Sequence, residues 1–550
     1  MVTDRLAELV RTALQETDSR GVAQNKDIEP EFERPRRREH GDWSTNVALV
    51  AAVPGTNPRT IAQTLVEHLP ASPLIDKVEV AGPGFLNFYL SAEWLHDVVR
   101  RAANAESGFG TSGEGAGVSV NVEFVSANPT GPLSVVSGRH AAVGDAVANL
   151  LQATGHRVTR EFYMNDAGAQ AMKFAQSIAV RYLQHFGRDA EIPEGGYQGD
   201  YVAGIARKLA DQQGDALLST SDDERIQAAR DFGLERMMAA IKESLQRFRT
   251  TFDVWTSEQA LYAGGVQQGI EELVRLGVTE ERDGAVWFQS SRFGDDKDRV
   301  LVRSDGRPTY LASDVAYMRD KIARGFDRLI YLLGPDHHGT IPRLLALADA
   351  LGFGKDRVEI RIAQVVSLSR GGDKVKASKR AGVLVPLDEL VDDVGVDAAR
   401  YTFLTRSMDA PLDFDIDLVK EEAPENPVFY VQYAHARICS ILRRAEEEGV
   451  LPDIANAPLE LLVHPSEHEL MRKLASYEET VPEAARLRAP QRIARYVEEL
   501  AATFTTFYRD CKVVTDDPDL TQARLALCVA TARVLATGLS LLGVSAPARM

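Results

Sequence analysis

A proline-rich turn places residues that could bind phosphate at the end of a predicted strand. Residues 118–125 predict the strand, and residues 133–152 predict the helix that follows the turn. Pro132 suits the first turn of that helix, where its missing N–H costs nothing. Ligands bind beyond the carboxyl ends of parallel strands, and free N–H groups at a helix start favour phosphate. The turn is therefore a candidate site, although an ordinary strand–helix connection would show the same pattern.

A basic cluster is a second candidate for phosphate chemistry. Lys374, Lys376, Lys379 and Arg380 lie close together in the sequence. Mobile cations in such a loop could neutralise phosphate charge. A solvated basic loop is the alternative.

Tyr310 and Asp314 have the spacing of neighbours on a helix. The two residues are four apart and would share one face of a helix. The resemblance described below implies that this pair recognises a guanidinium group, which needs a planar carboxylate partner and a site without competing cations. Alternatively, Asp314 is a charge at a helix N-terminus and Tyr310 is a packed aromatic residue.

The elements that position these residues belong to several domains, as expected for 550 residues. Residues 1–105 predict a small α+β domain, and residues 106–117 predict a glycine-rich linker. A β-α-β alternation in residues 118–409 predicts a doubly wound parallel sheet, interrupted by helices at 165–260. Strand patterns return at 285–289, 300–303 and 329–333, and residues 410–550 are predicted to be helical.

The linker formally matches a dinucleotide-binding pattern in Gly108-Phe109-Gly110-Thr111-Ser112-Gly113. It precedes a strand instead of following one. We therefore interpret it as a linker and set aside a nucleotide-binding dehydrogenase.

The net charge of −17 argues against a general polyanion binder, because unspecific nucleic-acid affinity comes from Lys and Arg. Any RNA site must be locally basic, and the densest basic run contains Arg36, Arg37 and Arg38. Tyr430 and Tyr433, three apart on a predicted helix, could stack on RNA bases. Aromatic residues at this spacing are more often part of a core.

The three cysteines, Cys439, Cys511 and Cys528, are far apart and predict neither a disulfide framework nor a zinc site. This pattern fits a reducing, cytoplasmic location. The apolar stretch 525–544 contains Arg533 and is predicted to be a buried helix, with no membrane span.

Long collinear blocks of the sequence resemble bacterial arginyl-tRNA synthetases. The run from Val122 to Leu133, followed by Gly138-Arg139 and Ala142-Val143-Gly144-Asp145, is similar to the signature region of that family. Further similar blocks are Arg38-Glu39-His40-Gly41-Asp42, Tyr163-Met164-Asn165-Asp166, Phe293 to Arg299 and Asn426 to Arg437. The resemblance covers nearly the whole chain. It implies a Rossmann-type class I catalytic domain, an N-terminal α+β domain that contacts tRNA, and a C-terminal all-α anticodon-binding domain.

The resemblance also implies an arginine site and a tRNA surface. The arginine-binding residues would be Glu123, Asn128, Tyr310, Asp314 and His337. The tRNA-binding residues would be Arg36, Arg37, Arg38, Tyr430, Tyr433, Arg437 and Met550.

The first ATP signature departs from the family pattern. Class I synthetases carry His-x-Gly-His at this helix start, where the histidines donate hydrogen bonds to ATP and the glycine leaves room for adenine. This chain has Ser134-Val135-Val136-Ser137. Serine hydroxyls can still donate hydrogen bonds but are shorter, and the β-branched Val136 would occupy the surface on which the purine lies.

The run Lys376-Ala377-Ser378-Lys379-Arg380 is similar to the second ATP signature of the family. Its lysines would neutralise the β- and γ-phosphates of ATP. The resemblance assigns catalysis to Ser134, Ser137, Lys376 and Lys379. It assigns ATP binding to these four residues together with Val136 and Ser378.

The implied reaction is the ATP-dependent activation of L-arginine and its transfer to arginine tRNA. Mg²⁺ would accompany ATP, no protein-bound metal is expected, and activation would need the cognate tRNA. A cytoplasmic monomer is expected. The alternative is a paralogue that retains arginine or tRNA binding but has lost or altered adenylation, with a regulatory, resistance or specialised biosynthetic role.

Overall fold

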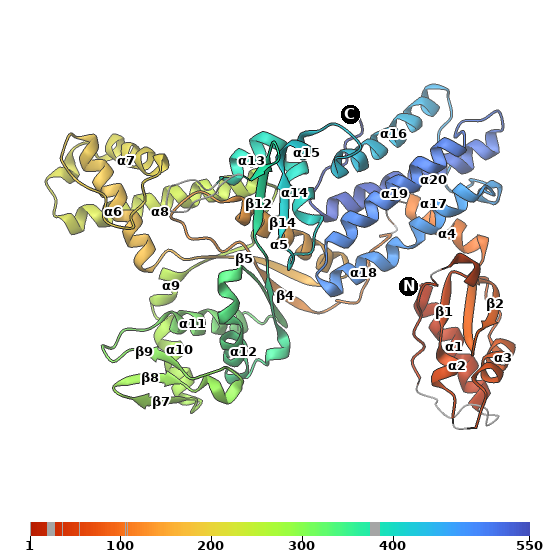
Figure 1. Ribbon diagram of the computed structural model, residues 1–550, viewed down its shortest axis with the longest axis horizontal. Coiled ribbons are helices and arrows are strands. Elements are labelled where there is room, and N and C mark those ends of the chain that lie inside the picture. The colour runs from red at the N-terminus through yellow and green to blue at the C-terminus, as the bar shows by residue number, and fades with distance from the viewer. Residues whose placement is uncertain are drawn as a thin grey trace.

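The computed structural model describes residues 2–18, 28–35, 37–53, 55–104, 106, 108–374 and 385–550. Its first part is a small α+β domain at one end of the molecule (Figure 1). Helices α1 (Val2–Asp18), α2 (Val47–Val50) and α3 (Pro58–His68) accompany an antiparallel sheet of order β1-β3-β2. Its strands are β1 (Trp43–Thr45), β2 (Ile75–Ala81) and β3 (Phe85–Leu90).

Helix α4 (Ala92–Ala103) leaves this domain and packs on α17 (Pro465–Ala475) and α20 (Pro518–Leu541). The predicted segment 1–105 therefore ends in a helix that lies against the C-terminal bundle (Figure 1). Its buried face includes Trp94, Val98 and Val99.

The centre of the molecule is a parallel sheet of order β11-β10-β4-β5-β6, so the expected doubly wound sheet is confirmed. The strands are β4 (Ser119–Glu123), β5 (Arg157–Met164), β6 (Val254–Ser257), β10 (Arg328–Leu333) and β11 (Val358–Ile362). Strand β4 has β5 on one side and β10 on the other. The order of the strands thus reverses at β4, and a ligand crevice is expected beyond its carboxyl end.

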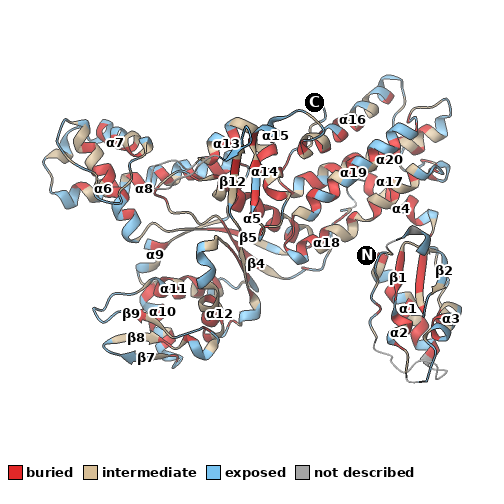
Figure 2. Cartoon of the chain, viewed as in Figure 1, coloured by how far each residue is buried: buried red, intermediate tan, exposed pale blue. Residues whose placement is uncertain are grey.

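Helix α5 (Val135–Ala153) follows β4 and is buried over most of its length (Figure 2). It packs very closely on the sheet, because a Cβ on Gly144 would lie 2.2 Å from the ring of Phe124. Pro132 precedes the helix, and Ser134 is the N-cap, so the expected position of Pro132 in the first turn is wrong. The Ser134 side chain accepts the Ser137 N–H and fixes this start.

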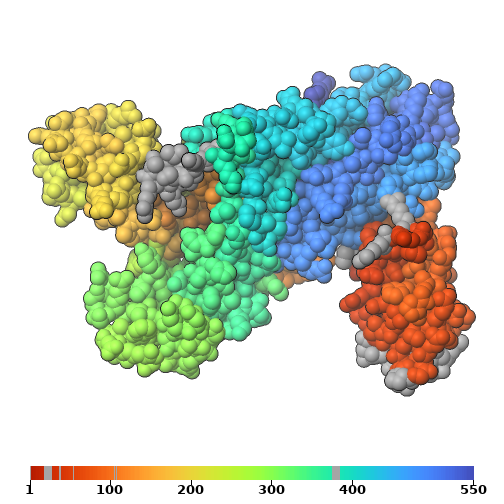
Figure 3. All heavy atoms as spheres, viewed as in Figure 1, coloured from red at the N-terminus to blue at the C-terminus, as the bar shows by residue number. Residues whose placement is uncertain are grey.

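Two insertions project as separate lobes from one side of the molecule (Figure 3). The first contains α6 (Gly168–His185), α7 (Asp200–Gln213) and α8 (Asp222–Arg247). The second contains α9 (Glu258–Tyr262), α10 (Gly265–Arg275), α11 (Tyr310–Ala323) and an antiparallel sheet of β7 (Thr279–Arg282), β8 (Ala285–Phe288) and β9 (Arg299–Val302). The strand patterns at 285–289 and 300–303 therefore form this separate sheet, and only 329–333 joins the parallel sheet.

The helical prediction for 165–260 is wrong at its end, where residues 254–257 form β6 at the edge of the parallel sheet. Its sequence, Val-Trp-Thr-Ser, does not alternate between apolar and polar residues, so it shows no strand pattern. Pairing with β5 stabilises this strand in the folded chain.

The last part begins with β12 (Val366–Arg370), β13 (Asp373–Lys374), α13 (Leu387–Val394), α14 (Val396–Leu404), β14 (Leu412–Asp415) and α15 (Ile416–Lys420). The helical prediction for 410–550 is wrong at its start, where β14 pairs with β12. The predicted helices then follow as α16 (Pro427–Glu447), α17, α18 (Tyr477–Leu487), α19 (Gln491–Asp510) and α20. Among the described helices, α20 alone has the length and composition of a membrane span, but most of it is buried. It packs on α4, α16 and α19 as a core helix.

A buried arginine joins three parts of this fold. Arg400 on α14 donates to Asp145 Oδ2 on α5 at 2.6 Å, to Phe248 O after α8 at 2.9 Å and to Leu542 O after α20 at 3.2 Å. Asp145 also accepts from Arg160 Nε at 3.2 Å. Because Arg400 is fully buried, its hydrogen bonds are not replaced by water when it is removed.

Replacing Arg400 with methionine is expected to lower the free energy of unfolding by about 3 kcal/mol, because buried polar groups lose their donor. Urea denaturation measures this change. The matched control is Arg406→Met at an exposed position shortly after α14, which should change stability by less than about 0.5 kcal/mol. Equal stabilities of the two variants would contradict the assigned role of Arg400.

Candidate active site

The turn after β4 holds a buried carboxylate in a fixed position. Glu123 ends the strand and is 5% exposed. It accepts hydrogen bonds from Lys321 Nζ at 2.6 Å and from Ser126 Oγ at 3.1 Å. Val125 and Ser126 have φ values of 68° and 42°, which cost energy for residues other than glycine. The strained turn directs Ser126 back onto Glu123, and Ser126 also accepts the Tyr163 N–H of the neighbouring strand.

A second carboxylate, Asp314, lies on α11, where the sequence predicts it to share a helical face with Tyr310. Burial raises the pKa of Asp314 to about 6, and the nearby Glu258 and Glu123 carboxylates contribute in the same direction. Arg343 opposes this shift by donating from Nη2 to Asp314 Oδ2 at 3.0 Å. Arg343 contacts only that oxygen, and its own buried Nε has no partner within the described residues.

Glu258 is a functional candidate that the sequence prediction missed. It directly follows β6, is 2% exposed and accepts from Ser313 Oγ at 3.2 Å. Rotating the Asn165 amide to satisfy its neighbours makes its nitrogen donate to Glu258 Oε2 at 2.6 Å. Burial raises the pKa of Glu258, and the Asp166 carboxylate also raises it. Recognising 254–257 as a strand would have placed this carboxylate at the carboxyl end of a strand, as Glu123 is, and made it a candidate for the same site.

These carboxylates differ in whether the chain supplies a cation. Lys321, which is fully buried, pairs with Glu123, and Arg343 pairs with Asp314. Both predicted carboxylates therefore already have a cationic partner from the chain itself. Glu258 has no cationic partner in the part of the chain that the structure describes.

The contacts of the other predicted arginine-binding residues are with residues outside this group. Tyr310 begins α11 and is 60% exposed, and its hydroxyl lies 3.6 Å from the Cβ position of Gly168. Asn128 Nδ2 donates to Gln170 Oε1 on α6 at 2.7 Å. His337 is exposed in the turn η4 (Pro335–Thr340) after β10, where its Nε2 lies 3.6 Å from Asp336 Oδ2.

The segment Ser134–Ser137, which replaces the family's first ATP signature, forms the start of α5. Ser134 and Ser137 place their hydroxyl oxygens 3.2 Å apart, so the two side chains hydrogen-bond to each other. Val136 is half-buried beside them. The second signature, with Lys376, Ser378 and Lys379, lies outside the described residues. Its downstream flank reaches α5, because Val135 N donates to Val385 O at 3.3 Å and Leu387 N donates to Leu133 O at 2.8 Å.

The predicted tRNA residues lie in the N-terminal domain and in the C-terminal helical part of the chain. Arg37 pairs with Glu39 on an exposed surface at 3.3 Å. Arg36 and the Arg38 side chain lie outside the described part. Tyr430 on α16 is half-buried, and its hydroxyl lies 3.4 Å from Thr505 Oγ1.

An exposed aromatic cluster on α16 is a better candidate for contact with bases. Tyr433 is 42% exposed and stacks on Phe429 with ring centroids 6.0 Å apart. The Arg437 guanidinium lies 4.8 Å from the Tyr433 ring and 5.3 Å from the Tyr508 ring. Met550 is exposed, and the tail before it is attached to α16, where Arg443 Nη1 donates to Ala548 O at 2.9 Å.

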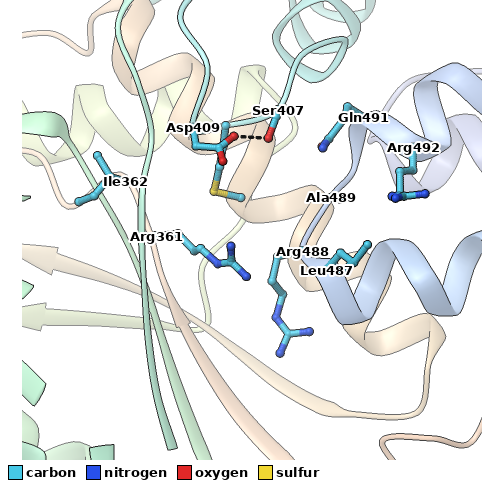
Figure 4. Close-up of a pocket in the computed structure, with 10 residues that line it drawn as sticks. Arg361, Ile362, Ser407, Asp409, Leu487, Arg488, Ala489, Gln491 and Arg492 are labelled. Atoms are coloured by element: carbon cyan, nitrogen blue, oxygen red, sulfur yellow. Dashed lines mark hydrogen bonds between the residues drawn. The ribbon is translucent and has the colours of Figure 1, made fainter. Parts of the chain in front are cut away.

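A separate cavity of about 230 Å³ lies between the end of β11, residues 407–409 and the connection from α18 to α19 (Figure 4). Three of its lining residues are Arg361, Arg488 and Arg492, and Ser407 donates to Asp409 at its edge. None of the predicted site residues lines it.

Comparison with family models divides the chain into three matches. Residues 4–90 match the arginyl tRNA synthetase N terminal domain, and residues 111–409 match the tRNA synthetases class I (R) catalytic domain. Residues 431–550 match the DALR anticodon binding domain.

Individual relatives agree along the whole chain. The arginine–tRNA ligase of Desulforamulus reducens is 43% identical over 100% of this chain and 99% of its own, and that of Moorella thermoacetica is 47% identical over 95% and 94%. A putative arginyl-tRNA synthetase structure from Campylobacter jejuni has a TM-score of 0.77 at 33% identity, covering 84% of this chain and 100% of its own. The Thermus thermophilus arginyl-tRNA synthetase structure has the same TM-score at 25% identity and covers 100% of both chains. These matches support the ligase and give no support to the alternative without adenylation. The chain belongs to the arginyl-tRNA synthetase family.

Proposed function

We propose that this arginine–tRNA ligase binds the guanidinium group of arginine among Glu258, Asp314 and Glu123. The observation that carries the proposal is the burial of Glu258 without a cation from the described chain. A buried carboxylate without a cation is costly unless a ligand supplies the positive charge. Arginine would supply it.

The charges of the neighbouring side chains also support a guanidinium at this site. Glu123, Glu258 and Asp314 interact through their charges, whereas Lys321 and Arg343 provide two cations. One guanidinium would supply the cationic partner that Glu258 lacks among the described residues. Its planar donors could reach two carboxylates at once, which the ammonium group of lysine cannot do with the same geometry.

The remaining predicted residues would orient the substrate. We propose that Tyr310 covers the guanidinium, and that Asn128 and His337 act nearer the α-amino and carboxylate groups. The arginine carboxylate then attacks the α-phosphorus of ATP, forming arginyl-adenylate and releasing pyrophosphate. A hydroxyl of the terminal adenosine of tRNA next attacks the activated carbonyl and releases AMP.

We propose that ATP, accompanied by Mg²⁺, lies in the crevice between β4, the start of α5 and the turn after β10. Ser134 and Ser137 would donate hydrogen bonds to it, while Lys376, Ser378 and Lys379 would neutralise its phosphates. The position of Val385 against Val135 supports this, because it brings the end of the basic loop to the start of α5.

We also propose how the whole chain is used. Residues 1–105 would contact tRNA outside the anticodon, residues 106–117 connect to a catalytic part at 118–409, and residues 410–550 bind the anticodon. Contacts would come from Arg36, Arg37, Arg38, Tyr430, Tyr433, Arg437 and Met550. The protein would act as a monomer in the cytoplasm.

Replacing Glu258 with glutamine is expected to weaken arginine binding by about 2 kcal/mol, roughly thirtyfold, because a charged hydrogen bond is lost. The melting temperature should rise or stay constant, since a carboxylate whose pKa is raised by burial opposes folding at neutral pH. Calorimetry and thermal unfolding test both parts. The exposed Glu271→Gln on α10 is the matched control, and equal arginine affinity in both variants would refute the assignment of Glu258.

Replacing Tyr433 with alanine is expected to weaken tRNA binding by about 1–3 kcal/mol, the usual contribution of an aromatic side chain stacked on a base. Filter binding should show the loss for intact arginine tRNA and not for the same RNA without its anticodon loop. The exposed Leu451→Ala in the same bundle is the control. An equal loss with both RNAs would place Tyr433 outside the anticodon site.

Changing Ser134→His, Val136→Gly and Ser137→His together is expected to increase arginine- and tRNA-dependent pyrophosphate exchange at least a hundredfold, or about 3 kcal/mol. Histidine donors reach farther than serine, and glycine frees the surface beside adenine. The same change should lower stability by about 1 kcal/mol, because Ser134 caps α5. An unchanged exchange rate would show that the serines and Val136 do not limit the reaction.

A further inference from the structure

His140 is a buried histidine for which the proposed function gives no role. It lies on α5 three residues after Ser137, on the same face of the helix. The residue is 6% exposed, and its Nε2 is buried without a hydrogen-bond partner among the described residues. Buried polar atoms without partners are rare and costly, so one beside a ligand crevice calls for a functional explanation.

The ring of His140 faces the turn after β10. Its Cε1 atom lies 3.9 Å from the position that a Cβ would take on Gly334, the residue that begins this turn. Asp336 Oδ1 lies 2.7 Å from the same point. Because β10 is the neighbour of β4 on the side opposite to β5, His140 and Asp336 meet where the strand order reverses.

The chemistry of His140 and Asp336 suits a hydroxyl group better than a phosphate. Burial, assisted by the neighbouring Arg139 charge, lowers the pKa of His140 to about 4. The imidazole is therefore neutral at pH 7 and offers one donor and one acceptor. The Asp336 carboxylate would repel a phosphate but can accept from a hydroxyl.

We propose that His140 is a further nucleotide-binding residue, whose Nε2 hydrogen-bonds to a ribose hydroxyl of ATP beside Asp336. The inference rests on the proposed position of ATP between α5 and the turn after β10. It gives His140 a role in holding the nucleoside that differs from phosphate neutralisation. The serines at the helix start and the basic loop would still have to act on the phosphates.

The test measures the binding of ATP, 2′-deoxy-ATP and 3′-deoxy-ATP by calorimetry. His140→Phe keeps the size of the ring but removes its hydrogen bond, whereas His140→Gln can place an amide near the position of Nε2. His185→Phe at the end of α6 is the matched control, because His185 is exposed and distant from the crevice. Arginine affinity and the melting temperature are measured for every variant.

His140→Phe is expected to weaken ATP binding about tenfold, the usual effect of one lost hydrogen bond. It should reduce the preference for ATP over one of the two deoxynucleotides and leave arginine affinity unchanged. His140→Gln should recover part of the ATP affinity, and His185→Phe should behave as the unmodified chain.

Two results would overturn the inference while leaving the proposed function intact. One is unchanged ATP affinity and deoxynucleotide preference in His140→Phe. The other is an equal loss of ATP and arginine affinity, with a lower melting temperature, which would make His140 structural. Absence of ATP binding by the unmodified chain would overturn both the inference and the proposed ATP site, whereas arginine binding would then still test the guanidinium site separately.

Discussion

The unbalanced negative charge at the carboxyl ends of the parallel strands is the constraint on which the site depends. Glu123 ends β4 and Glu258 follows β6, while Asp314 reaches the same region from α11. Lys321 and Arg343 neutralise two of these groups, so the folded chain retains a carboxylate that a cationic substrate can neutralise. Two features hold these charges in place. They are the strained turn at Val125 and Ser126 and the buried Lys321.

The start of α5 combines a structural and a chemical task. Ser134 caps the helix and pairs with Ser137, so the local sequence favours a stable helix start. Histidines at these positions would reach farther into the crevice but would remove the serine cap. Stability and transition-state stabilisation therefore compete at these residues. His140, one turn farther along, adds a neutral polar group without disturbing the cap.

Much of the fold could be predicted from local patterns. The β-α-β alternation predicts β4 and α5 to within about two residues, and strong helical periodicity predicts the C-terminal bundle. Strand β6 was missed because four residues carry no clear period. The separate sheet of β7, β8 and β9 could not be distinguished from the parallel sheet, because strand patterns do not state which strands pair.

The site was predictable only where its residues share a motif. Glu123 and Asp314 were found through their motifs, and the structure brings their charges together. Lys321 and Arg343 were not found, because a cation far along the chain shows no local sign that it will contact a particular carboxylate. Glu258 depended on recognising β6. Roles for Tyr310, Asn128 and His337 remain predictions, since none of their contacts is with the three carboxylates.

The number of protons released when arginine binds tests most directly whether arginine supplies the missing positive charge. The pKa of Asp314 is raised to about 6 in the free site, so this carboxylate is partly protonated near that pH. A bound guanidinium favours the ionised form and expels the proton, so arginine affinity should fall as the pH decreases through about 6. Calorimetry in buffers of different ionisation enthalpy should show proton release on arginine binding at pH 6 and little at pH 8. Equal affinities at both pH values without proton release would contradict the claim that arginine supplies the missing positive charge.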